Sequence, residues 1–154
     1  MVLNVKVVVV GITLTLPISS AAICMMLGLD GLAAGAATVG CCANMIGFAV
    51  ISYRENGFGG LMAQGIGTSM LQMPNILRNP RIWIPSIAAS AVLGPVSTMV
   101  FKMENIPIGA GMGTCGLVGQ VGTIAAMGES SEVYMAILLL HFILPAMISL
   151  FVAR

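Results

Sequence analysis

Long uncharged intervals separate the charged residues of this chain. Only 7% of its 154 residues are charged, whereas a typical soluble domain has about 25%. Each interval is close to the roughly 20 residues that cross a bilayer as an α-helix. The sequence therefore predicts an all-α membrane protein, a polytopic helical bundle surrounded by membrane lipid. The six intervals are 7–29, 31–53, 56–77, 82–101, 105–128 and 133–153.

Four of these intervals have the composition of spanning helices. Interval 133–153 is the most apolar, and interval 82–101 begins at Trp83, a residue suited to the membrane–water interface. Interval 7–29 contains a proline followed by serines, so we expect a kinked span there. Because further spans follow it and no clear cleavage site ends it, we interpret it as a retained helix rather than a signal peptide.

Small residues share one face of interval 31–53. Gly31 and Gly35 form a G-x-x-x-G pair, a pattern that lets two membrane helices approach closely. The same interval carries a stripe of small or polar residues at helical spacing, which predicts tight packing against another helix. The stripe consists of Ala36, Gly40, Asn44 and Gly47.

Intervals 56–77 and 105–128 are rich in glycine and carry side-chain amides. Such backbone is tolerated at membrane depth only where protein buries it or it lines a watery cavity. We therefore expect re-entrant or broken helices. Residues 65–69 and 111–115 are similar, as in transporters built from repeats, although coincidence is the favoured alternative in a chain with 19 glycines.

The basic residues predict an orientation. With four spans, one side of the membrane holds five basic residues and the other holds only Lys102. Basic residues favour the cytoplasmic side. The 54–81 connection and the C-terminus should then be cytoplasmic, and segment 102–132 should dip in from outside. The five residues are Lys6, Arg54, Arg78, Arg81 and Arg154.

Several classes of function are disfavoured. A net charge of +1 offers no basic patch for nucleic acid, and the glycine run 109–116 lacks the lysine of a phosphate-binding loop. Glu129 and Glu132 lie in a short polar link, and no catalytic triad is recognisable, so we expect no catalytic residue.

The cysteines lack zinc-site spacing; we expect them to be small buried residues and expect no metal or cofactor. They are Cys24, Cys41, Cys42 and Cys115.

Polar residues within these intervals are the candidates for binding. Glu104 and Asn105 precede the glycine-rich interval 105–128, where a broken helix could place them around a polyol; the alternative is that Glu104 pairs with Lys102 at the surface. His141, inside an apolar interval, must face protein or water, either as a ligand or proton carrier or in a helix–helix hydrogen bond. The predicted substrate-binding residues are Glu104, Asn105, Thr114, Gln120, His141 and Asn44.

Five side-chain amides can each be interpreted in two ways. Each can hydrogen-bond either a polyol or a neighbouring helix, and the second, structural role is favoured for each of them. They are Asn44, Gln64, Gln72, Asn75 and Gln120.

Most of the chain resembles one membrane family. The resemblance lies in Thr15–Ser20, Gly35–Cys42, Gly65–Gln72, Asn79–Pro85 and Lys102–Gln120. These segments are similar to enzyme IIC proteins of the sugar phosphotransferase system, in particular the perfringolysin-regulator-like subfamily.

The resemblance implies several properties. It implies a multi-pass protein of the bacterial plasma membrane that binds a sugar, forms a homodimer and works with soluble A and B phosphotransferase components. The match is to the C-terminal half of such proteins, so the N-terminal half would be a missing partner. In the family, a membrane-embedded glutamate and a histidine bind the sugar, which implies these roles for Glu104 and His141. Glu104 is followed by Asn-Ile-Pro, which departs from the glucose-type context and leaves the sugar undefined.

Three hypotheses follow. The first is a sugar-translocating permease subunit, in which 105–128 lines a polar cavity. The second is a membrane regulator or sensor that keeps the permease scaffold without transport. The third is a structural fragment that cannot function alone.

Overall fold

The computed structural model describes residues 2–16 and 18–154, and most of these residues are helical, with no β-strand among them. Three of the helices are long and apolar enough to cross a membrane: Gly31–Ile51, Pro80–Met99 and Ser131–Ala153. They coincide with three of the four expected spans. The predicted fold class, a helical membrane bundle, is confirmed.

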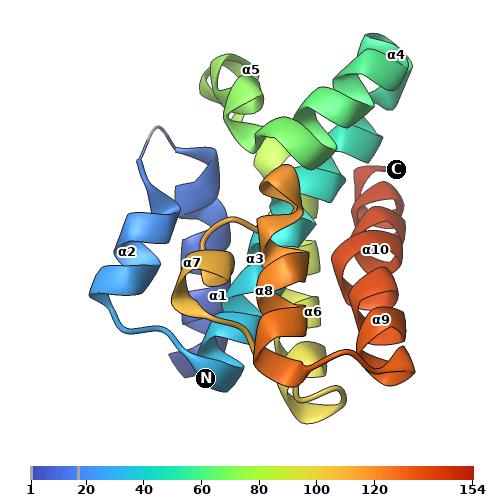
Figure 1. The fold of residues 1–154 in the computed structure, drawn as a ribbon. Helices are drawn as coiled ribbons and strands as arrows, with labels where there is room; N and C mark the ends of the chain where they lie inside the picture. The colour runs from blue at the N-terminus through green and yellow to red at the C-terminus, as the bar shows by residue number, and fades with distance from the viewer. Residues whose placement is uncertain (1, 17) are drawn as a thin grey trace.

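Helix α3 (Gly31–Ile51) lies at the centre of the bundle (Figure 1). It packs against α1 (Val2–Thr15), α6 (Ile84–Met99) and α10 (Leu144–Ala153). In its most apolar window 89% of the residues are buried inside the protein, against 39% and 33% for the other two spanning helices. Lipid therefore has little access to α3.

The small residues of α3 explain this central position. A Cβ atom on Gly40 would lie 2.4 Å from the backbone oxygen of Val7 in α1. A Cβ atom on Gly47 would lie 2.7 Å from the hydroxyls of both Ser86 in α6 and Ser149 in α10. The predicted close packing of the stripe is confirmed, with three neighbouring helices instead of one.

The prediction of a single kinked span over 7–29 is wrong. Helix α1 ends at Thr15 and a separate helix, α2 (Ser20–Met26), leads back to the start of α3. Because a proline cannot continue a helix without losing a hydrogen bond, the chain needs a new helix start, and the Ser19 hydroxyl provides one by accepting from the Ala22 N–H at 3.3 Å. Pro17 itself lies outside the described residues.

Both glycine-rich intervals are broken, as expected. Segment 102–128 enters through α7 (Pro107–Ala110), turns at residues 111–117 and leaves through α8 (Val118–Met127). Its two ends meet, since the Glu104 N–H lies 3.2 Å from the Met127 sulfur. This segment is a re-entrant hairpin, called the 102–128 hairpin below.

The second glycine-rich interval lies at the opposite end of the bundle. It contains α4 (Tyr53–Met62), a π-helical turn (Ala63–Gly67), a 3₁₀ turn (Ser69–Gln72) and α5 (Met73–Arg78). These four short elements replace the single helix that its length allows.

The ends of the bundle differ in charge. All four arginines lie at the end where α3 and α10 finish, whereas Asp30, Lys102 and Glu104 lie at the other, where α3 begins and α6 finishes. Helix α1 runs parallel to α3, because Val10 contacts Cys41 and Leu14 packs with Met45. Lys6 therefore does not share the arginine end, and the count in the sequence analysis is corrected to four basic residues there.

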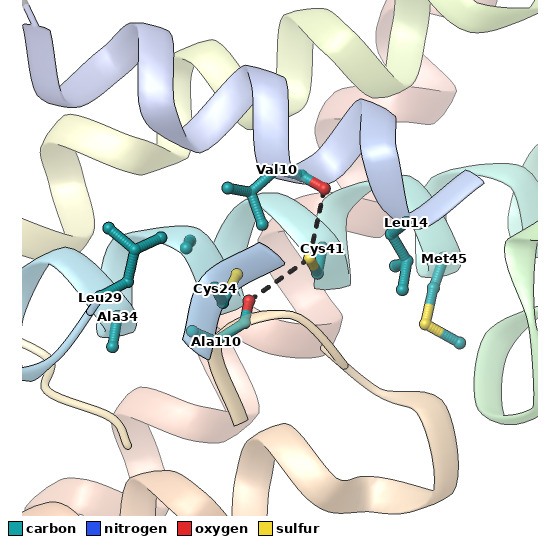
Figure 2. Close-up of a cluster of buried hydrophobic side chains, with 9 residues drawn as sticks. Val10, Leu14, Cys24, Leu29, Ala34, Cys41, Met45 and Ala110 are labelled. Atoms are coloured by element: carbon teal, nitrogen blue, oxygen red, sulfur yellow. Dashed lines mark hydrogen bonds between the residues drawn. The ribbon is translucent and has the colours of Figure 1, made fainter. Parts of the chain in front are cut away.

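The cysteines are free thiols. Cys24, Cys41 and Cys42 are buried, and Figure 2 shows Cys41 between α1 and the hairpin, with its sulfur 3.7 Å from the Val10 oxygen and 3.5 Å from the Ala110 oxygen. Cys115 is only half-buried and lines a surface groove beside Ile18 and Met70. The predicted burial is thus confirmed for three of the four thiols.

This difference predicts selective labelling. In the folded protein, a membrane-permeant maleimide is expected to modify Cys115 first and to leave the other three thiols unmodified until denaturant is added, because only Cys115 is accessible. Mass spectrometry of proteolytic peptides would measure this. Labelling of Cys41 at the rate of Cys115 would contradict the packing of α1 and the hairpin on α3, and a Cys115→Ser variant that does not label in the native state is the control.

Candidate functional site

Asn105 holds the hairpin onto α3. Its side-chain amide donates to the Thr38 hydroxyl at 2.6 Å, the Gly119 carbonyl at 2.9 Å and the Thr123 hydroxyl at 3.2 Å, and its Oδ1 accepts from the Ile106 N–H at 2.8 Å. An amide has two N–H hydrogens, so three acceptors already share them. The structure places Asn105 as a fully buried cross-link between both arms of the hairpin and the central helix.

Thr114 occupies the inner part of the hairpin. Its hydroxyl donates to the Gly65 carbonyl and lies 3.4 Å from the Met45 sulfur. Gly65 belongs to the π-helical turn of the other glycine-rich interval. The two broken segments therefore meet beside α3, although they start from opposite ends of the bundle.

Gln120 and His141 form a buried pair between α8 and the last spanning helix. Gln120 Nε2 lies 3.1 Å from His141 Nδ1 and 3.7 Å from the Cys42 sulfur. Gln120 Oε1 and His141 Nε2 are buried without a hydrogen-bond partner among the described residues. Buried polar atoms are almost always paired, so this pair has both an acceptor and an imidazole nitrogen available to another group.

The backbone around His141 departs from α-helical geometry. Between α9 (Ser131–Ile137) and α10, residues 138–143 form a π-helical turn. Pro145 cannot donate to the carbonyl of residue 141, four positions earlier, and its ring crowds that carbonyl. The added π turn accommodates this, and such turns frequently occur at functional sites.

Asn44 lies apart from these residues, on another face of α3. Its amide donates to the Gly40 carbonyl at 3.0 Å and the Ser90 hydroxyl at 3.2 Å, and its Oδ1 accepts from the Trp83 indole at 3.3 Å. Asn44 therefore joins α3 to α6. Trp83 turns inward at the start of α6 as part of this contact.

Glu104 is exposed at the end of the bundle where the hairpin begins. It adjoins Asn105 in sequence, but it shares none of the hydrogen bonds of Gln120 and His141. The six predicted residues thus divide into an exposed carboxylate, a hairpin group on one side of α3 and Asn44 on another. The hairpin group contains Asn105, Thr114, Gln120 and His141.

The amides at the arginine end bond to one another. Gln72 Nε2 donates to Gln64 Oε1 at 2.8 Å, and Asn75 Nδ2 donates to Gln72 Oε1 at 3.0 Å. Ser52 also donates to Gln64, at 3.3 Å. The structural interpretation of these three amides is confirmed.

Two further polar residues, Thr38 and Thr123, escaped the sequence analysis. Both accept from Asn105. Thr38 shares a helical face with Cys42 and Met45, the residues that contact Gln120 and Thr114. The helical spacing of Thr38, Cys42 and Met45 was the only sign in the sequence that these residues share a face. It points to a site only once the hairpin is known to pack against that face.

Among residues 2–16 and 18–154, no group of three or more metal-ligating side chains is close enough to hold an ion. The site therefore consists of neutral hydrogen-bonding groups, with Glu104 as the nearest carboxylate in sequence. Such a set suits a neutral, hydroxyl-rich molecule better than an anion or a cation.

The comparison with protein families gives a match over nearly the whole chain. A family model described as "Phosphotransferase system, EIIC" matches residues 5–154. Neither a curated protein nor a solved structure matches the chain.

Proposed function

Because the chain belongs to the enzyme IIC family of the phosphotransferase system, we propose that it binds a sugar and carries it across the membrane as the permease subunit of such a system. Family membership and the three membrane-competent helices make it a membrane transport component that works with a sugar and soluble phosphotransferase components. The identity of the sugar-binding groups is the proposal.

The observation that carries the proposal is the buried Gln120–His141 pair behind the re-entrant hairpin. Gln120 Oε1 accepts a hydrogen bond from a sugar hydroxyl. Because Gln120 Nε2 donates to His141 Nδ1, the neutral imidazole carries its proton on Nε2, which donates to another sugar hydroxyl. Transporters built from structural repeats bind their substrates at broken helices near the middle of the membrane. The exposed Glu104 lies at the entrance of the hairpin, where a carboxylate can accept two hydroxyl hydrogens as the sugar enters.

The other three buried residues predicted to bind the sugar have less structural support for that role. Asn105, Thr114 and Asn44 each bond within the protein. To contact a sugar, each must exchange one of these bonds during the transport cycle. Their present geometry supports a role in fixing the helices around the site.

We also propose that the chain acts with the N-terminal half of a permease, in a homodimer in the bacterial plasma membrane, and that it belongs to the perfringolysin-regulator-like subfamily. Exposed apolar residues of the hairpin, such as Leu117 just before α8 at 42% and Val121 on α8 at 63%, support a further protein or lipid neighbour over the hairpin. The arginine end faces the cytoplasm, in accordance with the positive-inside rule, so the soluble A and B components meet the protein there.

The test is phosphoenolpyruvate-dependent uptake of a panel of sugars into vesicles that carry the full-length parent protein with its soluble partners. The wild type is expected to accumulate one sugar as its phosphate. The Glu104→Gln variant should accumulate the same sugar at least about tenfold more slowly, because it loses charge-assisted hydrogen bonds. The matched control is Glu129→Gln, an exposed carboxylate in the link after α8, which should transport like the wild type. If no sugar accumulates under any condition, the permease proposal is wrong and the regulator hypothesis replaces it.

A further inference from the structure

Arg54 and Arg154 line a single cavity at the arginine end of the bundle, where α3 and α10 finish. Figure 1 shows the end of α10 beside the junction of α3 with α4. The remaining lining is aliphatic, from Val50, Ile51, Leu150 and Ala153. None of the side chains that line this cavity is acidic, and Glu55, which follows Arg54 in the sequence, lines a different cavity together with Arg78.

The side chains that line the cavity include two guanidinium groups and no acidic group, so an anion in the cavity would balance their positive charge. Arginine binds phosphate through paired N–H groups and holds its charge at any physiological pH. The cavity therefore has the chemistry of a phosphate-binding site, with aliphatic walls that a free inorganic ion would not use.

The walls continue into the lipid-facing surface of α10. Met147 and Leu150 are 62% and 44% exposed on this helix, below Arg154. A ligand with a phosphate and an attached hydrocarbon chain can contact both the arginines and this surface. Basic pockets between membrane helices on the cytoplasmic side bind anionic lipid headgroups in this way.

We propose that this cavity binds an anionic phospholipid, with the phosphate between Arg54 and Arg154 and an acyl chain along α10. The site is separate from the Gln120–His141 pair and does not depend on sugar transport. It attaches the end of the last spanning helix to the cytoplasmic leaflet.

Native mass spectrometry of the detergent-purified chain, titrated with phosphatidylglycerol, tests the proposal. One tightly bound lipid is expected on the wild type. The paired variant Arg54→Gln/Arg154→Gln is expected to bind it roughly 30-fold more weakly, since each basic residue near an anionic lipid contributes about fivefold. Both side chains are exposed, so the variant should fold, and an unchanged melting temperature in lipid-free detergent would verify that.

The matched control is Arg78→Gln/Arg81→Gln, which removes two charges from the same end outside the cavity and should bind the lipid like the wild type. Equal weakening in both pairs would mean that only general electrostatics acts, and it would overturn the proposal. Two probes separate the sources of phosphate: phosphatidylcholine, whose headgroup is neutral overall, and inorganic phosphate. If inorganic phosphate displaces the lipid at an equal concentration, the cavity is a site for a free anion and the proposal is wrong.

Discussion

The His141→Leu variant is expected to lose sugar accumulation by about 100-fold in the vesicle assay while the protein stays folded. The substitution removes the nitrogen that, in our proposal, bonds a sugar hydroxyl, and it leaves that hydroxyl unpaired in a buried site. The lost bond and the unpaired hydroxyl together cost about 3 kcal/mol, which corresponds to about 100-fold. Leucine also leaves the buried Gln120 amide without its imidazole partner, which costs about 1–3 kcal/mol of stability. A monodisperse peak in size-exclusion chromatography would show that the variant still folds.

The control for this prediction is Ser149→Ala. Ser149 also belongs to the last spanning helix, and its buried hydroxyl also has no hydrogen-bond partner among the described residues, but it faces Gly47 of α3 instead of Gln120. This variant should accumulate sugar like the wild type. Gln120→Leu should reproduce the loss seen with His141→Leu. If His141→Leu and Gln120→Leu both transport normally, the pair does not bind the sugar, and the remaining candidates Glu104 and Asn105 become the next to test.

The Gly35→Ala variant is expected to lose about 3 kcal/mol of stability or to fail to fold. A Cβ atom at this position would lie 1.9 Å from the backbone oxygen of Met103, so the clash is with main chain, which cannot rotate away. Overpacking of this kind typically costs 1–3 kcal/mol, and more where nothing can shift. The start of the hairpin, which the Asn105 N–H ties to the Gly31 carbonyl at 3.1 Å, would be pushed off α3. Thermal unfolding followed by size-exclusion chromatography in detergent measures the effect.

Gly59→Ala is the matched control, because Gly59 lies in the exposed helix α4 and a Cβ atom there would meet nothing within 4 Å. Alanine favours a helix over glycine by roughly 0.5–1 kcal/mol, so this variant should be as stable as the wild type or slightly more stable. Equal stability of Gly35→Ala and Gly59→Ala would contradict the close approach of the hairpin to α3.

Much of the candidate site was predictable, because exposing a polar side chain to lipid costs free energy. A histidine in interval 133–153 or a glutamine in interval 105–128 had to face protein or water wherever the helices lay. Composition alone therefore marked His141 and Gln120. Their pairing was not predictable, because they are 21 positions apart in the sequence and the turn between α8 and α9 separates them.

Glu104 and Asn105 illustrate the limit of sequence reasoning most directly. They are neighbours in the chain, both polar, and the sequence analysis gave them one shared role. In the structure Asn105 is fully buried among three acceptors, and Glu104 is exposed. Consecutive residues on an extended stretch point in opposite directions, and only the packing of the hairpin decides which of the two directions is inward.

From the sequence alone we could predict a helical membrane protein, the three long apolar helices in intervals 31–53, 82–101 and 133–153, and the two intervals that break. These properties follow from local composition: apolar length, glycine content and the spacing of charges. The packing of the folded chain decided that residues 7–29 turn back and that α3 is enclosed by its neighbours. These properties depend on contacts between residues far apart in the chain, such as Val10 with Cys41 and Thr38 with Asn105, and no local pattern contains them.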